Sequence, residues 1–186
     1  MLQKSNRHKV LQVFFDDPHP GGNMGYPLRE ICRRSKLPPP SVKRYLDEFT
    51  KEGHYGYHLI LKEKPNFTKA YPRYLANSAS EYYKFLKKQN IIQRIYESGL
   101  LLYLQQTCLP RAIILYGSAS RGEDIAESDI DLFILSKDRK LSVKKYEKDL
   151  NRKIHLFFKE EFHKLSNELK NNILNGALLY GYIKVF

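Results

Sequence analysis

Two aspartates, two positions apart, form the pattern in this chain with the clearest chemical consequence. Asp129 and Asp131 lead into the apolar run Leu132 to Leu135, which is typical of a buried strand. Because side chains alternate along a strand, both carboxylates are expected on one face, about 7 Å apart. Two carboxylates this close repel each other unless a cation lies between them. The natural cation is Mg²⁺, which prefers oxygen ligands and commonly bridges carboxylates to phosphates.

A glycine–serine turn precedes the two aspartates. Gly117 and Ser118 follow the apolar run Ala112 to Tyr116, which predicts a second buried strand. The polar residues after the turn can begin a helix, where free backbone N–H groups favour phosphate. The turn and the aspartates together therefore predict a site for a phosphorylated ligand and its metal ion.

The spacing of these two features resembles that of a known family. Ten residues, 119–128, separate Gly117-Ser118 from Asp129-Ile130-Asp131. This arrangement is similar to the nucleotidyltransferases of the DNA polymerase-β superfamily. Residues 117–132 also match the string GSxxRGxxxxxSDIDL of its minimal nucleotidyltransferase branch. The resemblance implies an α+β domain over residues 110–186, with a mixed sheet flanked by helices.

The resemblance also implies roles for particular residues. Asp129 and Asp131 would be catalytic and would bind Mg²⁺ or Mn²⁺. The reaction would transfer a nucleoside monophosphate from a nucleoside triphosphate, with ATP favoured, to an acceptor hydroxyl, releasing pyrophosphate. The residues expected to bind the nucleotide are Gly117, Ser118, Arg121, Gly122 and Ser128.

The third carboxylate of the family has no match in this chain. In the family it lies on a later strand and serves as metal ligand and base. The corresponding run, Lys153 to Phe158, has His155 at that position. An imidazole can act as a base or a weak ligand, although Mg²⁺ prefers oxygen. Three interpretations stay open: His155 is catalytic, the site is impaired, or Glu160 or Glu161 takes the place of the carboxylate.

The first 77 residues predict a separate domain. Helical spacing covers Arg7 to Phe15, Leu28 to Ser35 and Ser41 to Lys51. Two β-like runs follow, Tyr55 to Leu61 and Phe67 to Tyr74, around a polar turn from Lys62 to Asn66. This order resembles a winged helix-turn-helix domain, which implies DNA binding by the third helix and the wing. The residues expected to contact DNA are Ser41, Lys43, Arg44, Lys51, Lys62 and Lys64.

Residues 78–109 predict a helical connector that packs on the C-terminal domain. Their apolar face favours one or two helices, with a kink near Ser98-Gly99. Beyond the strand that carries His155, the pattern predicts a helix over 160–175 and a β-like piece over 178–186.

Composition sets further bounds. The 186 residues carry a formal net charge of +12, which favours polyanionic partners. Residues 1–77 hold 14 Lys and Arg against 7 Asp and Glu, so the N-terminal part is strongly basic. No apolar run is long enough for a membrane span, and the start of the chain lacks a signal-peptide core. Cys32 and Cys108 suit small buried thiols, and together these features predict a reducing cytoplasm.

Three functions fit the sequence. The first is a metal-dependent nucleotidyltransferase fused to a DNA-binding winged helix. The second is a transcription regulator whose nucleotidyltransferase domain senses nucleotide but is catalytically impaired. The third is an antitoxin that acts on a partner toxin or another acidic protein. A homodimer is expected if the N-terminal domain reads two DNA half-sites.

Overall fold

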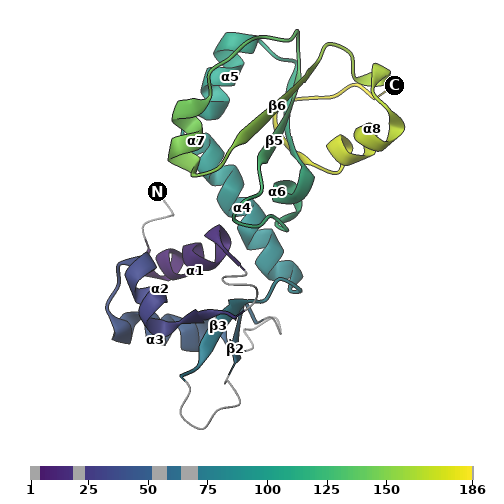
Figure 1. The fold of residues 1–186 in the computed structure, drawn as a ribbon. Coiled ribbons are helices and arrows are strands. Elements are labelled where there is room, and N and C mark those ends of the chain that lie inside the picture. The colour runs from purple at the N-terminus through teal and green to yellow at the C-terminus, as the bar shows by residue number, and fades with distance from the viewer. Residues whose placement is uncertain (1–4, 19–23, 52–57, 64–70, 186) are drawn as a thin grey trace. The chain divides into compact units, whose positions relative to one another are not determined.

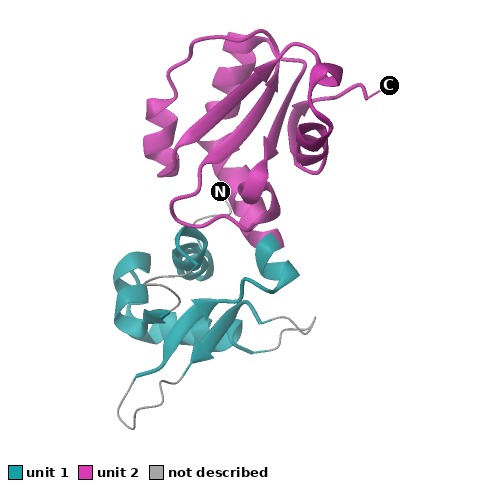
Figure 2. Cartoon of the chain, turned by 45° about the vertical axis from the view of Figure 1, so that its right-hand side comes forward, with its two compact units in different colours: residues 1–84 teal, residues 85–186 magenta. Residues whose placement is uncertain are grey.

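The computed structural model describes residues 5–18, 24–51, 58–63 and 71–185. It divides into two compact units, Met1–Lys84 and Phe85–Phe186 (Figure 2). The boundary lies inside helix α4, Glu81–Glu97.

Three helices form the core of unit 1. Helix α1, Asn6–Asp16, begins at Ser5, whose hydroxyl accepts a hydrogen bond from the His8 N–H. Helix α2 spans Leu28–Ser35 and helix α3 spans Pro39–Phe49. Helix α3 starts two residues earlier than predicted because proline fits the first helical turn. The helices bury a shared apolar set that includes Val10, Phe14, Ile31, Val42, Leu46 and Phe49.

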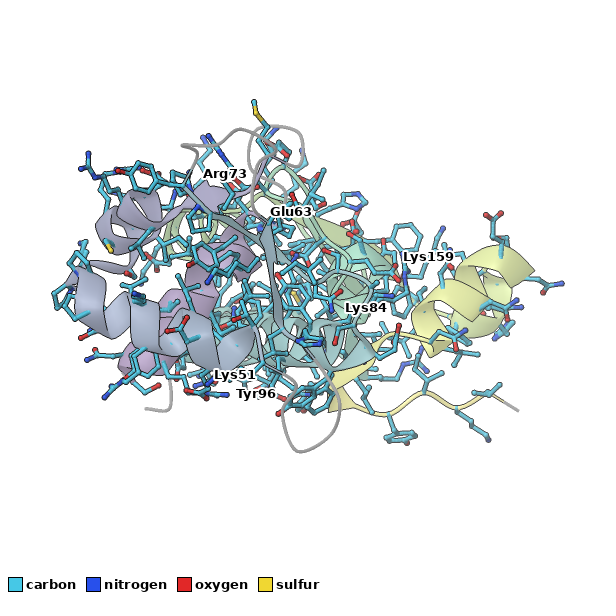
Figure 3. All side chains as sticks on the ribbon, turned by 90° about the horizontal axis from the view of Figure 1, so that it is seen from below. Lys51, Glu63, Arg73, Lys84, Tyr96 and Lys159 are labelled. Carbon is cyan, nitrogen blue, oxygen red and sulfur yellow. The ribbon has the colours of Figure 1, made fainter. Side chains whose placement is uncertain are left out.

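A small antiparallel sheet completes unit 1. Its strands are β1 (Tyr26–Pro27), β2 (Ile60–Glu63) and β3 (Arg73–Ala76), in the order β1-β3-β2. Glu63 pairs with Arg73 across the two longer strands (Figure 3). The prediction that a turn begins at Lys62 is therefore wrong, because pairing of opposite charges favours extending the strand through Glu63. Residues 52–57 and 64–70, with the predicted contact Lys64, lie outside the described residues.

Unit 2 is built on a mixed four-stranded sheet. Its strands are β4 (Ala112–Tyr116), β5 (Ile130–Leu135), β6 (Ile154–Lys159) and β7 (Ala177–Gly181), in the order β6-β5-β4-β7. The β5–β6 pair is parallel, and β4 pairs antiparallel with β5 and β7. The expected α+β architecture with a mixed sheet is thus observed.

Helices cover both faces of this sheet (Figure 1). Helices α4, α5 (Leu100–Cys108) and α7 (Lys144–Leu150) pack on the face that carries Ile130 and Leu132. The short helix η2 (Phe162–Lys164) and helix α8 (Asn167–Leu174) pack on the opposite face, against Phe133 and Leu135. The central strands β4 and β5 are buried on both faces, which explains their continuous apolar runs.

The predicted kink near Ser98-Gly99 is confirmed as a break between α4 and α5. Gly99 has φ of 79°, a left-handed conformation that L residues rarely adopt. A Cβ built on Gly99 would meet nothing within 4 Å, so only the backbone conformation requires glycine there.

Two predictions for the C-terminal segment need correction. The helix expected over 160–175 is divided into η2 and α8, because the Ser166 hydroxyl accepts from the Leu169 N–H and begins a new helix. The strand expected to reach Phe186 ends at Gly181, whose φ is 72°. A Cβ at Gly181 would collide with the Arg111 carbonyl, so only glycine fits at the position where the chain leaves the sheet.

The length of the apolar helices and the state of the two cysteines were the remaining expectations from composition. Within the described ranges, no helix is long and apolar enough to cross a bilayer. Cys108 is buried and Cys32 is partly buried, and both are free thiols. Burial raises the pKa of each thiol.

Candidate functional site

Asp131 is held inside the sheet. It is the second residue of β5 and lies opposite Tyr116 on β4 and His155 on β6. Its Oδ1 is 3.4 Å from Nδ1 of His155, and 29% of its side chain is exposed. Both neighbouring strands therefore fix the position of this carboxylate.

Asp129 lies just before β5. Its position depends on the backbone hydrogen bonds of the residues next to it in the chain. The Ile130 N–H donates to the Lys153 carbonyl at 2.9 Å. Asp129 is exposed, Ile130 is buried and Asp131 is half-buried, as expected when alternate residues face the same side. The strand thus presents the two carboxylates while Ile130 enters the core.

The electrostatics of Asp131 reflect this neighbourhood. Burial raises the pKa of its carboxyl, the hydrogen bond and the charge of His155 lower it, and the charge of Asp129 raises it. Burial and the Asp131 charge also raise the pKa of Tyr116. A bound cation would relieve the repulsion between the two aspartates.

Gly117 brings the glycine–serine turn against the aspartates. It has φ of 73° and begins the short helix α6, Gly117–Arg121. A Cβ at this position would lie 2.5 Å from Oδ2 and 3.4 Å from Cγ of Asp131. The backbone of the turn can therefore approach the carboxylate only because residue 117 lacks a side chain.

The other predicted nucleotide-binding residues shape the loop after α6. Gly122, with φ of 71°, ends the helix, and the Ser128 hydroxyl accepts from the Ile125 N–H at 2.9 Å. Arg121 is exposed, and its Nε forms an ion pair of 2.7 Å with Glu123. A contact from Arg121 to phosphate would therefore replace the contact to Glu123.

A buried ionic cluster underlies this loop and was missed by the sequence prediction. Asp124 forms ion pairs with Nζ of Lys87, at 3.4 Å, and with Nη2 of Arg152, at 2.8 Å. At most 7% of each of these three side chains is exposed. One signal was present in the sequence, because Lys87 interrupts the apolar helical stripe of Tyr83, Ile91 and Ile95.

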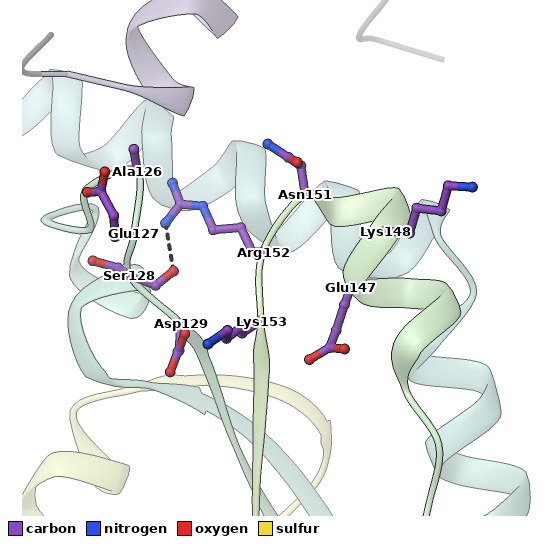
Figure 4. A pocket seen from close by; sticks show the side chains of 9 residues that line it. All are labelled: Ala126, Glu127, Ser128, Asp129, Glu147, Lys148, Asn151, Arg152 and Lys153. Carbon is purple, nitrogen blue, oxygen red and sulfur yellow. Dashed lines mark hydrogen bonds between the residues drawn. The ribbon is translucent and has the colours of Figure 1, made fainter.

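A cavity of about 580 Å³ opens beside Asp129 (Figure 4). It lies between the loop that leads into β5 and the junction of α7 with β6. Acidic and basic side chains both line it, so it suits a polar ligand rather than an apolar one. Its residues are Ala126, Glu127, Ser128, Asp129, Glu147, Lys148, Asn151, Arg152 and Lys153.

The side chains fit a single divalent ion better than a pair of ions. Asp129 and Asp131 offer carboxylate oxygens, which Mg²⁺ and Mn²⁺ accept alongside phosphate oxygens. On β6, however, the residue opposite Asp131 is His155, and Lys153 lines the cavity with Asp129. Across the part of the chain that the structure describes, no three His, Cys, Asp or Glu side chains cluster around a position suited to a metal.

The predicted DNA-binding residues that the structure describes in unit 1 lie on or just after one helix and on one strand. Lys43, Arg44 and Lys51 are exposed on or just after α3, and Ser41 is half-buried there. Arg44 donates to the Tyr45 hydroxyl at 2.9 Å. Lys62 is exposed on β2, outside the turn where it was expected.

Comparison with known proteins supports part of these predictions. Residues 98–182 match the family model described as "Polymerase beta, Nucleotidyltransferase". The matched segment includes the whole sheet of unit 2 and the residues from Gly117 to His155 considered above. No curated protein and no solved structure matches the chain. Residues 98–182 are therefore similar to the nucleotidyltransferase domain of the polymerase-β superfamily.

Proposed function

We propose that the nucleotidyltransferase domain matched by residues 98–182 transfers a nucleoside monophosphate from a nucleoside triphosphate, with ATP favoured, to an acceptor hydroxyl. One observation carries the proposal. The Gly117 backbone approaches the Asp131 carboxylate so closely that any side chain at residue 117 would collide with it. A phosphate-binding turn and a metal-binding carboxylate in contact are what a metal–triphosphate complex requires.

In this proposal Asp129 and Asp131 hold Mg²⁺ or Mn²⁺ with the triphosphate. When bound, the ion would supply positive charge beside the phosphates. The acceptor oxygen would attack the α-phosphorus, the bond from that phosphorus to the β-phosphate oxygen would break, and pyrophosphate would leave. The backbone at Gly117 and Ser118 orients the triphosphate, and Gly122 and Ser128 keep the loop compact. His155 would take the proton of the acceptor hydroxyl, and the exposure of 60% of its side chain beside Asp131 supports this role.

Transfer of a radioactive α-phosphate from ATP tests the proposal. The full-length protein is incubated with labelled ATP, Mg²⁺ or Mn²⁺ and candidate acceptors, and pyrophosphate release is measured in parallel. Asp129→Asn and Asp131→Asn should each abolish both signals. Asp138→Asn changes an exposed aspartate beyond the end of β5 and should leave them unchanged. Transfer that survives Asp129→Asn would refute the proposed site.

The second candidate function is a DNA-binding regulator whose nucleotidyltransferase domain senses nucleotide. The order α1-β1-α2-α3-β2-β3 in unit 1 supports a winged helix, and Lys43 and Arg44 are exposed on α3. His155 at the position of a carboxylate supports reduced turnover. A mobility-shift titration over several salt concentrations tests DNA binding, and nucleotide added to the same reactions tests sensing. Absence of DNA affinity at low salt would refute this candidate.

The third candidate function is that of an antitoxin. The net charge of +12 favours an acidic partner, and a partner toxin could supply the acceptor hydroxyl. The labelling assay identifies such an acceptor, because the label would appear on the band of the added partner protein and not on a small molecule.

The expected homodimer is tested separately. Analytical ultracentrifugation of the protein at several concentrations, in buffer with the salt concentration of cytoplasm, measures whether the mass is that of one chain or of two.

A further inference from the structure

We propose that Asp124 and Arg152, together with Lys87, are positioning residues that fix the location of Asp129 in the metal site. This inference depends on the proposed function, because it concerns how the same two aspartates are held. The two carboxylates are supported differently, and only Asp131 lies within a strand that is paired on both sides.

Asp129 depends on anchors outside its own strand. Nη1 of Arg152 donates to the Ser128 carbonyl at 3.2 Å, directly before Asp129. The Lys153 carbonyl accepts from the Ile130 N–H at 2.9 Å, directly after it. Two consecutive residues ahead of β6 therefore hold the backbone on both sides of Asp129.

The buried cluster fixes Arg152 in turn. Its Nη2 is 2.8 Å from Oδ2 of Asp124, and the two side chains are 7% and 4% exposed. Lys87 reaches the same residue from α4, through the Asp124 carboxylate and the Asp124 carbonyl. One guanidinium thus connects the start of the loop, at Asp124, to its end, at Ser128.

The loop between these anchors is closed on itself. The Ile125 N–H donates to the Ser128 hydroxyl at 2.9 Å, and the Ser128 N–H donates to the Ile125 carbonyl at 3.1 Å. Residues 125–128 therefore move as one turn. If Arg152 released the Ser128 carbonyl, this turn and the adjoining Asp129 could shift while Asp131 stayed in the sheet.

The charges of the cluster favour positioning over stability as its role. Two cations surround one buried carboxylate, and the backbone carbonyls of Asp124 and Ser128 accept from the cations as well. Buried ion pairs add little stability compared with apolar packing, because desolvation offsets their attraction. They do impose a defined geometry, which is what a metal site with two carboxylates needs. Replacing groups that orient metal ligands from outside the first coordination shell commonly lowers metal affinity by about 10-fold to 100-fold.

The test is Mn²⁺ binding to the full-length protein, measured by electron paramagnetic resonance with a non-hydrolysable ATP analogue present. Arg152→Lys keeps the charge but loses the planar fork of N–H donors that joins Asp124 to Ser128, so Mn²⁺ affinity should fall about 10-fold. Arg111→Lys is the matched control. The Arg111 guanidinium donates to the Glu160 carbonyl, and the Arg111 backbone N–H donates to the Leu135 carbonyl at the far end of β5. This control should bind Mn²⁺ as the wild type does.

A second variant covers the case in which Arg152→Lys does not fold. Asp124→Asn keeps the shape of the side chain and removes the charge that holds Arg152, so it should weaken Mn²⁺ binding in the same direction. Thermal unfolding of each variant is measured alongside. Wild-type Mn²⁺ affinity in a folded Arg152→Lys or Asp124→Asn protein would overturn the inference and leave the proposed function intact. Absence of Mn²⁺ binding by the wild type would overturn both.

Discussion

Replacing Gly117 by alanine is expected to disable the site at a modest cost in stability. Gly117 has φ of 73°, where an L residue is disfavoured by about 1–2 kcal/mol. The added Cβ would lie 2.5 Å from Oδ2 of Asp131, well inside the 3.4 Å at which ordinary contact begins. The turn or the carboxylate must therefore move by roughly 1 Å, and such a misplacement costs about 100-fold in rate.

Gly99→Ala provides the matched control. Gly99 has φ of 79° and nothing lies within 4 Å of a Cβ built there. This variant carries the same backbone cost of about 1–2 kcal/mol without any collision. The difference between the two variants therefore isolates the contact between residue 117 and Asp131.

Two measurements are made on both variants. Urea unfolding should show a loss of about 1–2 kcal/mol for Gly99→Ala and a somewhat larger loss for Gly117→Ala, which adds the collision with Asp131. Label transfer from ATP should fall by about 100-fold only in Gly117→Ala. Mn²⁺ binding in the presence of an ATP analogue should also weaken only in Gly117→Ala. If both variants bind and react alike, the close approach of the turn to Asp131 has no functional role and the reasoning is refuted.

Three further predictions concern separate features. His155→Asp should raise Mn²⁺ stoichiometry from one to two, because a carboxylate would then face Asp131; unchanged stoichiometry in a resonance titration would contradict this. Hydrogen bonds from Arg33, and then Arg34, lower the pKa of Glu30 to about 2. The ion pairs of Glu30 therefore stabilise the folded protein fully above pH 4.5, the pKa of Glu30 in the unfolded chain. This stabilisation is lost as the pH falls toward 2. Glu30→Gln should cost about 1 kcal/mol at pH 7. Below pH 2, acid unfolding should show that Glu30→Gln costs no stability. An equal loss of stability at pH 7 and below pH 2 would be evidence against the ion pairs of Glu30. Lys43→Ala should reduce the salt slope of DNA binding by about 1 in a mobility-shift titration, and an unchanged slope would exclude a phosphate contact at that residue.

Local pattern predicted most elements of the C-terminal unit. The apolar runs at 112–116 and 132–135 predicted buried strands, and they lie in β4 and β5. The break at Gly99 was also predictable, because a glycine interrupts a helical stripe at that point. The prediction of one helix over 160–175 was wrong because the Ser166 hydroxyl caps the start of a new helix inside that range.

The sequence by itself therefore determined the strands, the glycine–serine turn, the paired aspartates and the family that these resemble, since all of these depend on residue type and short spacing. Only the tertiary structure decided which residues meet. Lys87, Asp124 and Arg152 come from three segments far apart in the chain. Their contact follows from how α4 packs on the sheet and how β6, which begins two residues after Arg152, pairs with β5. The register of β5 on β6 likewise sets His155 beside Asp131. Such contacts depend on long-range packing, which local periodicity does not encode.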